Sequence, residues 1–298
     1  MSLSLALTTL ALWVKAAPTR RALSRDDYLS TLDPNRAPAP PPARLRRTGR
    51  LRVTRRGGHE VVRYEPARRR AALELMYLPG GGLVNPLVAE HWWIVERLAR
   101  ATGAAVTVVN YPLAPEHRAA ETAAFVDAEY ARLAERVGSG RLIVAGDSAG
   151  GTVALGLSAR AERSPDALVL FSPWVDLALD NPAIARRSRR DPSLRAPGLR
   201  AAARAWVGGG SRDDPEVDPA RSDVSTLPPT LIFQGGNDIF FDDVAAFVRR
   251  ARKAGAPVSL VAAAGGFHVY VGAHWTPEAR AAYARVGDLA ESLFRVMT

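Results

Sequence analysis

The 298-residue chain contains no cysteine and only five histidines. Disulfides, iron–sulfur clusters, cysteine-containing zinc sites and a cysteine nucleophile are therefore excluded. No two histidines stand three or four residues apart, and the H-E-x-x-H zinc pattern is missing, which argues against a metal hydrolase. The lack of cysteine is compatible with a reducing compartment, so we expect a cytoplasmic protein, with membrane association as the alternative.

Lysine is also scarce, since 38 of the 40 basic residues are arginine. The net charge of +10 is unevenly distributed: residues 1–70 carry +11, and the remainder carries −1. No DNA- or RNA-binding motif accompanies this charge, so we expect no nucleic-acid partner. The basic segment is a solvated surface, a contact for an anionic membrane surface, or a contact for another polyanion.

Long hydrophobic runs are absent except for Ser2–Val14 at the N-terminus. Thirteen residues are too few to cross a bilayer as a helix. The positive charges follow this run rather than precede it, which disfavours a secretory signal. We expect a helix that covers an apolar surface of the protein itself, of a partner or of a membrane.

Beyond residue 50 the sequence is typical of an α/β protein. Residues 51–55 and 59–65 flank Gly57-Gly58 and predict a hairpin. Short apolar runs then alternate with helical segments, which predicts a mainly parallel sheet covered by helices on both faces. The runs expected to form this sheet are 72–78, 105–109, 142–145, 167–171, 230–234 and 258–263.

One segment, 176–227, interrupts this alternation without a clear strand. A break of about fifty residues is more typical of a functional insertion than of a bare loop. We therefore divide the chain into an N-terminal lid or cap over 1–45 and a catalytic domain over 46–298. The insertion at 176–227 completes the lid.

The most specific motif is Gly146-Asp147-Ser148-Ala149-Gly150-Gly151, between an apolar run and a helical segment. A serine between glycines at a strand-to-helix turn matches a nucleophile elbow, in which small neighbours permit a strained backbone. The helix N-terminus there favours developing negative charge. Ser148 is the candidate nucleophile, and the alternative is an ordinary glycine-rich turn with a capping serine.

A nucleophilic serine needs a base and an orienting acid, which in this motif order both follow the serine. Only His268 and His274 lie downstream, and we favour His268 because it follows a strand between glycines. Asp238 also follows a strand and is the preferred acid. Asp242 and Asp243 are expected to favour a helix N-terminus by charge. Asp147, which precedes the serine, is expected to brace the turn.

Stabilising a tetrahedral oxyanion requires hydrogen-bond donors. The backbone N–H of Ala149 is one candidate. The loop Gly80-Gly81-Gly82 can supply two more, because glycines let the bare backbone approach a substrate. The alternative for this loop is a plain turn.

Together these motifs resemble the hormone-sensitive-lipase-like branch of the α/β-hydrolase family, the microbial serine carboxylesterases. The resemblance runs from about residue 50 to 298 and is carried by six stretches: YLPGGG at 77–82, YPLAPEH at 111–117, GDSAGG at 146–151, SPWVD at 172–176, GND at 236–238 and GFH at 266–268. It implies Ser148, Asp238 and His268 as a catalytic triad and Gly81, Gly82 and Ala149 as the oxyanion hole. It also implies a lid and no metal or cofactor.

One departure from the family pattern is Pro79, which stands where the family usually has a histidine that braces the oxyanion loop. Proline fixes φ and removes a donor, so we expect this loop to be braced differently. His117 lies in a stretch that resembles a structural turn of the family and is not expected to be catalytic.

We therefore predict a serine hydrolase acting on small-molecule esters with short to medium acyl or acetyl groups. A membrane-peripheral lipid or steryl ester hydrolase, a lactone hydrolase and a non-catalytic binding protein are the alternatives. The oligomeric state is left open. Five aromatic residues are candidates for an apolar substrate pocket or, equally, for the core: Trp92, Trp93, Trp174, Phe267 and Tyr270.

Overall fold

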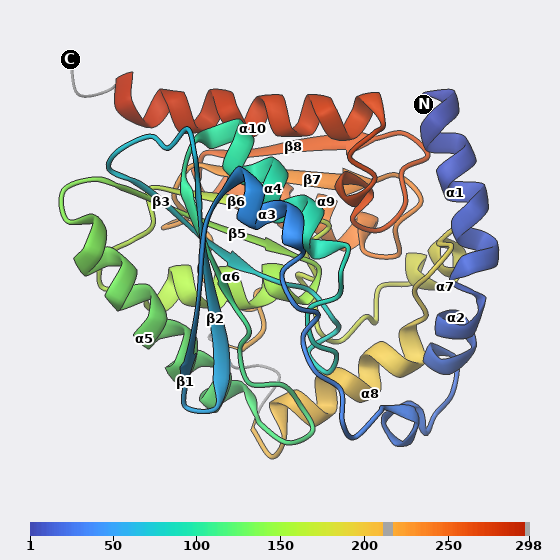
Figure 1. Ribbon diagram of the computed structural model, residues 1–298. Coiled ribbons are helices and arrows are strands. Elements are labelled where there is room, and N and C mark those ends of the chain that lie inside the picture. Colours follow the sequence, from blue (N-terminus) through green and yellow to red (C-terminus); the bar gives the residue numbers. More distant parts are fainter. Residues whose placement is uncertain (211–216, 296–298) are drawn as a thin grey trace.

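A computed structural model describes residues 1–210 and 217–295. The described residues form a single eight-stranded sheet (Figure 1). Strands β1 and β2 form an antiparallel hairpin, β2 also runs antiparallel to β4, and the remaining neighbours are parallel. In spatial order the strands are β1 (Gly49–Arg56), β2 (His59–Pro66), β4 (Ala105–Val109), β3 (Leu73–Leu78), β5 (Arg141–Asp147), β6 (Ala167–Phe171), β7 (Thr230–Gly235) and β8 (Val258–Ala263). The predicted hairpin and mainly parallel sheet are confirmed.

The central strands are mostly apolar, as expected where both faces of a sheet are covered. Every residue of β3, β4, β6 and β7 is buried. One face packs against α4 (His91–Thr102) and α10 (Pro277–Arg295), and the other packs against α5 (Ala119–Val137), α6 (Ala149–Arg160) and α9 (Phe241–Lys253). The sequence predicts a final helix over 277–296; α10 covers this range to Arg295, and residue 296 lies outside the described residues.

The N-terminal segment forms α1 (Leu3–Lys15), α2 (Ala17–Leu23), a short 3-10 helix η1 (Tyr28–Thr31) and α3 (Ala43–Thr48). The five prolines within 33–47 predict extended or irregular structure over that segment. Helix α3 corrects this prediction, because the prolines end at Pro42 and good helix formers follow, with Leu45 buried. No described helix is both long enough and apolar enough to cross a membrane.

The segment 176–227 forms α7 (Ala183–Ser188) and α8 (Ala196–Val207), while its residues 211–216 lie outside the described part of the chain. A second 3-10 helix, η2 (Tyr270–Gly272), precedes α10. Helix α8 contacts both α2 and η1, so the two segments predicted to form a lid pack against each other (Figure 1). Together they lie beside the edge of the sheet where the parallel strands end.

Candidate active site

Ser148 occupies the turn between β5 and α6 with φ 52° and ψ −122°. A non-glycine residue at positive φ is strained, and such strain is typical of a nucleophile elbow. The flanking glycines are required by space: a Cβ on Gly146 would overlap the carbonyl of Gly150, and one on Gly150 would overlap the carbonyl of Leu78. The local sequence therefore lets the backbone close tightly around the serine.

The structure brings Ser148, His268 and Asp238 into one hydrogen-bonded chain. Ser148 Oγ lies 2.8 Å from His268 Nε2, and His268 Nδ1 lies 2.9 Å from Asp238 Oδ2. Asp238 follows β7, His268 follows β8, and the other Asp238 oxygen accepts from the backbone N–H of Phe240 at 2.9 Å. A proton on Nδ1 is donated to the carboxylate in this arrangement, which leaves Nε2 free to accept from the serine hydroxyl.

Burial governs the charge of this histidine. Burial disfavours the imidazolium, but the Asp238 carboxylate and its hydrogen bond outweigh that effect and raise the pKa of His268. Asp238 itself is fully buried, and Ser148 is only 8% exposed. His268 is therefore placed to accept a proton from Ser148, and Asp238 is placed to stabilise the imidazolium that results.

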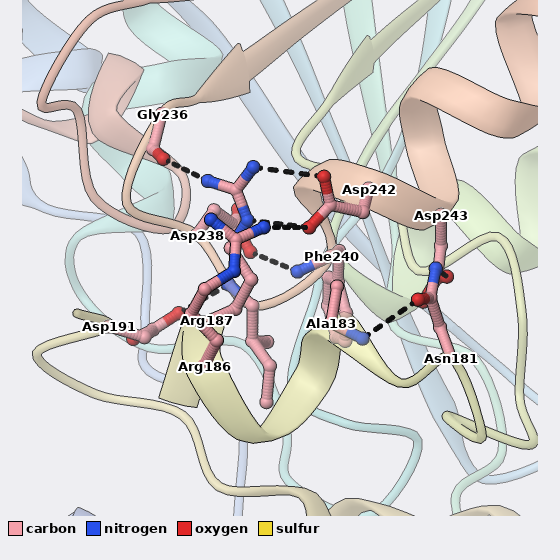
Figure 2. A network of polar contacts seen from close by, with 11 residues as sticks. Asn181, Ala183, Arg186, Arg187, Asp191, Gly236, Asp238, Phe240, Asp242 and Asp243 are labelled. Carbon is pink, nitrogen blue, oxygen red and sulfur yellow. Dashed lines mark hydrogen bonds and ion pairs between the residues drawn. The ribbon is translucent and has the colours of Figure 1, made fainter. Parts of the chain in front are cut away.

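The alternatives named from the sequence lie elsewhere. His274 packs against the ring of Trp93 and lies 3.1 Å from Arg97. Asp242 pairs with Arg187, and Asp243 accepts from Asn181 (Figure 2). None of these three groups contacts Ser148 or His268 in the part of the chain that the structure describes.

The glycine loop adopts backbone that favours glycine, with φ 143° at Gly81 and 63° at Gly82. The N–H groups of Gly81, Gly82 and Ala149 have no protein acceptor among residues 1–210 and 217–295. The loop is held from behind, where the N–H of Gly80 donates to Asp147 Oδ1 at 3.0 Å and Tyr111 Oη donates to the Pro79 carbonyl at 2.6 Å. Unpaired donors on an anchored loop suit a developing oxyanion.

Asp147 is the centre of this anchor, whereas the sequence predicted a brace within the turn itself. Tyr77 Oη donates to its Oδ1 at 2.5 Å, and His91 Nε2 lies 3.4 Å from its Oδ2. Burial opposes the charge of Asp147, but His91 and the hydrogen bonds outweigh it and lower its pKa. His91, on α4, thus supplies a histidine near the oxyanion loop although the one expected before the glycines is replaced by Pro79. No local sequence motif indicates this role for His91, because its contact with Asp147 joins residues that are far apart in the sequence.

A cavity of about 410 Å³ opens at Ser148. The N-terminal segment and the insertion both contribute apolar side chains to its wall: Leu12, Leu23, Tyr28, Leu194 and Leu199. Of the five aromatic candidates only Phe267 lines this cavity.

The pocket role is wrong for the other four aromatics. Trp92, Trp174 and Tyr270 are buried in the core, where Trp174 stacks on Phe240. Trp93 packs under the guanidinium of Arg44, with 3.5 Å between the guanidinium carbon and the ring centroid.

Known proteins match both the sequence and the fold. The family model for the alpha/beta hydrolase fold matches residues 75–272. An esterase from Acinetobacter venetianus is 31% identical over 228 residues, covering 74% of this chain and 75% of its own. An acetyl-hydrolase from Streptomyces hygroscopicus is 33% identical over 239 residues, covering 77% and 79%. The crystal structure of an esterase from the bacterial hormone-sensitive lipase family superposes with a TM-score of 0.81 at 25% identity, covering 98% of this chain and 99% of that one.

The chain therefore belongs to the α/β-hydrolase family, in its hormone-sensitive-lipase-like branch of esterases. It is an enzyme that hydrolyses carboxylic esters, and the resemblance seen in the sequence is confirmed.

Proposed function

We propose that the enzyme cleaves short to medium acyl esters through Ser148, His268 and Asp238. The observation that carries the proposal is the hydrogen-bonded chain from Ser148 Oγ to Asp238, which opens into an apolar cavity. Ser148 attacks the ester carbonyl, and His268 Nε2 takes the hydroxyl proton. Asp238 holds the histidine tautomer and stabilises the imidazolium.

The oxyanion of the tetrahedral intermediate is bound by the N–H groups of Gly81, Gly82 and Ala149. When the intermediate collapses, the alcohol leaves with the proton from His268, and the acyl group remains on Ser148 as an ester. A water molecule then gives its proton to His268 and attacks this ester. Collapse of the second intermediate releases the carboxylic acid and returns the proton to Ser148.

The size of the cavity supports the acyl range. A volume of about 410 Å³ is near the lower end for small-ligand pockets. Its lining residues from the N-terminal segment and from the insertion support a lid made of residues 1–45 and 176–227. The acetyl-hydrolase among the relatives agrees with a short acyl group.

Hydrolysis of p-nitrophenyl esters from acetate to palmitate tests this proposal. We expect the highest kcat/KM with short or medium chains and a fall of about 10⁴-fold or more in kcat for Ser148→Ala and Asp238→Asn. Ser158→Ala is the matched control and should retain activity, because Ser158 is a half-buried serine on α6, the helix that follows Ser148. Full activity in Ser148→Ala would contradict the mechanism. The highest kcat/KM on the palmitate ester would contradict the acyl range.

One feature favours a second candidate, hydrolysis at an anionic lipid surface. The outer face of α1 carries an apolar stripe, defined as Leu3, Leu7, Leu10 and Val14, whose exposed fractions are 76%, 57%, 64% and 77%. Four side chains are far fewer than the roughly 20–30 residues per side of a stable dimer. Residues 1–70 carry a net charge of +11, which complements anionic headgroups rather than a second, equally basic copy.

Co-sedimentation with phosphatidylcholine vesicles, with and without phosphatidylglycerol, tests this second candidate. We expect binding to the anionic vesicles that Leu7→Ser/Leu10→Ser abolishes, with hydrolysis of a water-soluble ester unchanged. Val53→Ser, at an exposed valine on β1, is the control and should bind as wild type does. No binding, or a dimer in light scattering that the double variant dissociates, would overturn the lipid candidate.

A further inference from the structure

The loop that carries Asp238 is bound on one side by the insertion (Figure 2). Arg187, on α7, donates from Nε and Nη2 to the Asp242 carboxylate at 2.7 and 2.9 Å. Its third nitrogen, Nη1, donates to the Gly236 carbonyl at 2.7 Å. Gly236 and Asp242 lie on either side of Asp238, so one buried guanidinium fixes both ends of this loop.

A second contact reaches the middle of the same loop. Asp191 is fully buried, and its Oδ2 accepts from the N–H of Ile239, next to Asp238, at 2.9 Å. Its Oδ1 accepts from the N–H groups of Ser193 and Leu194, both at 2.8 Å. Since Ser193 and Leu194 line the cavity, Asp191 links the cavity wall directly to the backbone beside Asp238.

The charge of Asp191 is unusual for a purely structural link. Burial and the nearby Asp238 carboxylate raise the pKa of Asp191, although its oxygens accept backbone hydrogen bonds. Two carboxylates in one buried site repel each other, and the positive charge of protonated His268 offsets part of that repulsion. Two cations are near this pair. Protonated His268 is contacted directly by Asp238 and faced at longer range by Asp191 and Asp147, and the Arg195 guanidinium donates to the backbone carbonyl of Asp191 at 3.0 Å.

We propose that Arg187 and Asp191 are positioning residues for ester hydrolysis: the insertion holds the Gly236–Asp242 loop so that Asp238 stays aimed at His268, and Asp191 adds a second negative charge behind the pair. The inference rests on the proposed function, because it assigns these two residues a role in the chemistry of Ser148, His268 and Asp238. By this proposal the insertion both covers the cavity and positions Asp238.

The two neighbouring arginines of α7 provide a matched test. The Arg187 side chain is 10% exposed and reaches Gly236, whereas the Arg186 side chain is 58% exposed and lies 3.5 Å from Asp242. We expect Arg187→Met to lower kcat about 10- to 100-fold on p-nitrophenyl acetate with less than a threefold change in KM, because a displacement near 1 Å costs this much. Arg187→Lys should recover part of the loss, and Arg186→Met should behave as wild type.

Equal kcat values for Arg187→Met and Arg186→Met, both folded by circular dichroism, would overturn the positioning role of Arg187. A fall in melting temperature for Arg187→Met without a fall in kcat would do the same, since a merely structural contact predicts that result.

The charge of Asp191 is tested by Asp191→Asn and the pH profile of kcat/KM. Removing a negative charge near His268 lowers the pKa of the imidazole, so the acidic limb should move to lower pH by roughly 0.5–1 unit. Asp166→Asn, at a carboxylate paired with Arg141 away from the site, should leave the limb in place. An unchanged limb in Asp191→Asn would overturn the electrostatic part of the proposal.

An NMR titration of the histidine side chains gives the same pKa without any turnover. With five histidines, His268 is assigned by its loss in His268→Gln. If wild type hydrolyses no ester, the proposed function fails, yet a downward shift of the His268 pKa in Asp191→Asn still supports the contact. If wild type is active and Ser148→Ala is not, an unshifted His268 pKa overturns only the role of Asp191.

Discussion

A buried carboxylate stands behind each end of the proposed triad, and the two have opposite surroundings. Asp147, beside Ser148, is met by Tyr77, by the N–H of Gly80 and by His91, which lower its pKa against the effect of burial. Asp191 binds the backbone of Ile239, next to Asp238. Burial and the Asp238 carboxylate raise the pKa of Asp191. Asp147 is therefore compensated by His91 and by hydrogen-bond donors, whereas Asp191 lies close to a second carboxylate.

The two ends also differ in what builds them. The contacts of Asp147 come from β3, β5 and α4, which belong to the central sheet and its covering layer. The contacts of the acid loop come from α7 and the residues after it, in the insertion. A change in the insertion can thus retune the acid and the base without disturbing the elbow.

The largest effect that separates the two ends is expected from Asp147→Ala. It leaves the N–H of Gly80 and the hydroxyl of Tyr77 without their acceptor, so the oxyanion loop loses its anchor. We expect kcat on p-nitrophenyl acetate to fall about 10²-fold, the order found for losing one oxyanion donor. Asp147→Asn keeps an acceptor for Gly80 and should cost less than about tenfold.

Steady-state kinetics on both variants, with circular dichroism as a check on folding, measure this difference. If Asp147→Ala and Asp147→Asn lose the same activity, the charge of Asp147 matters more than its contact with Gly80. The two ends of the triad would then depend on charge alike, and the contrast between them would disappear.

The sequence predicted the nucleophile end better than the acid end for a physical reason. The elbow is local: Gly146, Ser148 and Gly150 are within five residues, and their spacing alone restricts the backbone. Arg187 and Asp191 act on residues about fifty positions further along, and nothing in their own neighbourhood indicates those partners.

The aromatic residues show the same limit. Trp174 lies three residues beyond the end of β6, which is compatible with a pocket position, yet it stacks on Phe240 in the core. The alternation of apolar runs fixes which segments form strands, but only the packing of helices decides which large side chain meets the cavity.

A smaller effect is expected from His91→Gln, and its pH dependence identifies the pairing with Asp147. Asp147 raises the pKa of His91 against the effect of burial. A histidine whose folded pKa is raised stabilises the fold below its unfolded pKa, and this contribution is lost as the pH rises through the folded pKa. We expect a loss of about 1.5–3 kcal/mol in the free energy of unfolding at pH 5.5 and a smaller loss at pH 9.

Urea denaturation at the two pH values measures this loss. His117→Gln is the control, because His117 pairs with Glu121 at the surface and should cost little at either pH. A loss of equal size at pH 5.5 and pH 9 would mean that His91 acts by packing and not by charge, and the compensation of Asp147 would rest on Tyr77 and Gly80 alone.

The smallest effect concerns Asp243, on the acid side of the comparison. Burial raises its pKa to about 6, and three nearby carboxylates add to this. Those neighbours are Asp176, Asp180 and Asp242. Its Oδ1 accepts from Asn181 at 2.6 Å, while its buried Oδ2 has no hydrogen-bond partner among the described residues.

An acid whose folded pKa is raised destabilises the fold once the pH exceeds its unfolded pKa, and the cost is complete above the folded pKa. Asp243→Asn removes that charge and keeps an acceptor for Asn181. We expect the melting temperature to rise by roughly 2–4 °C at pH 8 and to stay unchanged at pH 4. A fall at pH 8 would mean that this carboxylate is compensated as Asp147 is, and that the excess of negative charge at the acid end is confined to Asp191 and Asp238.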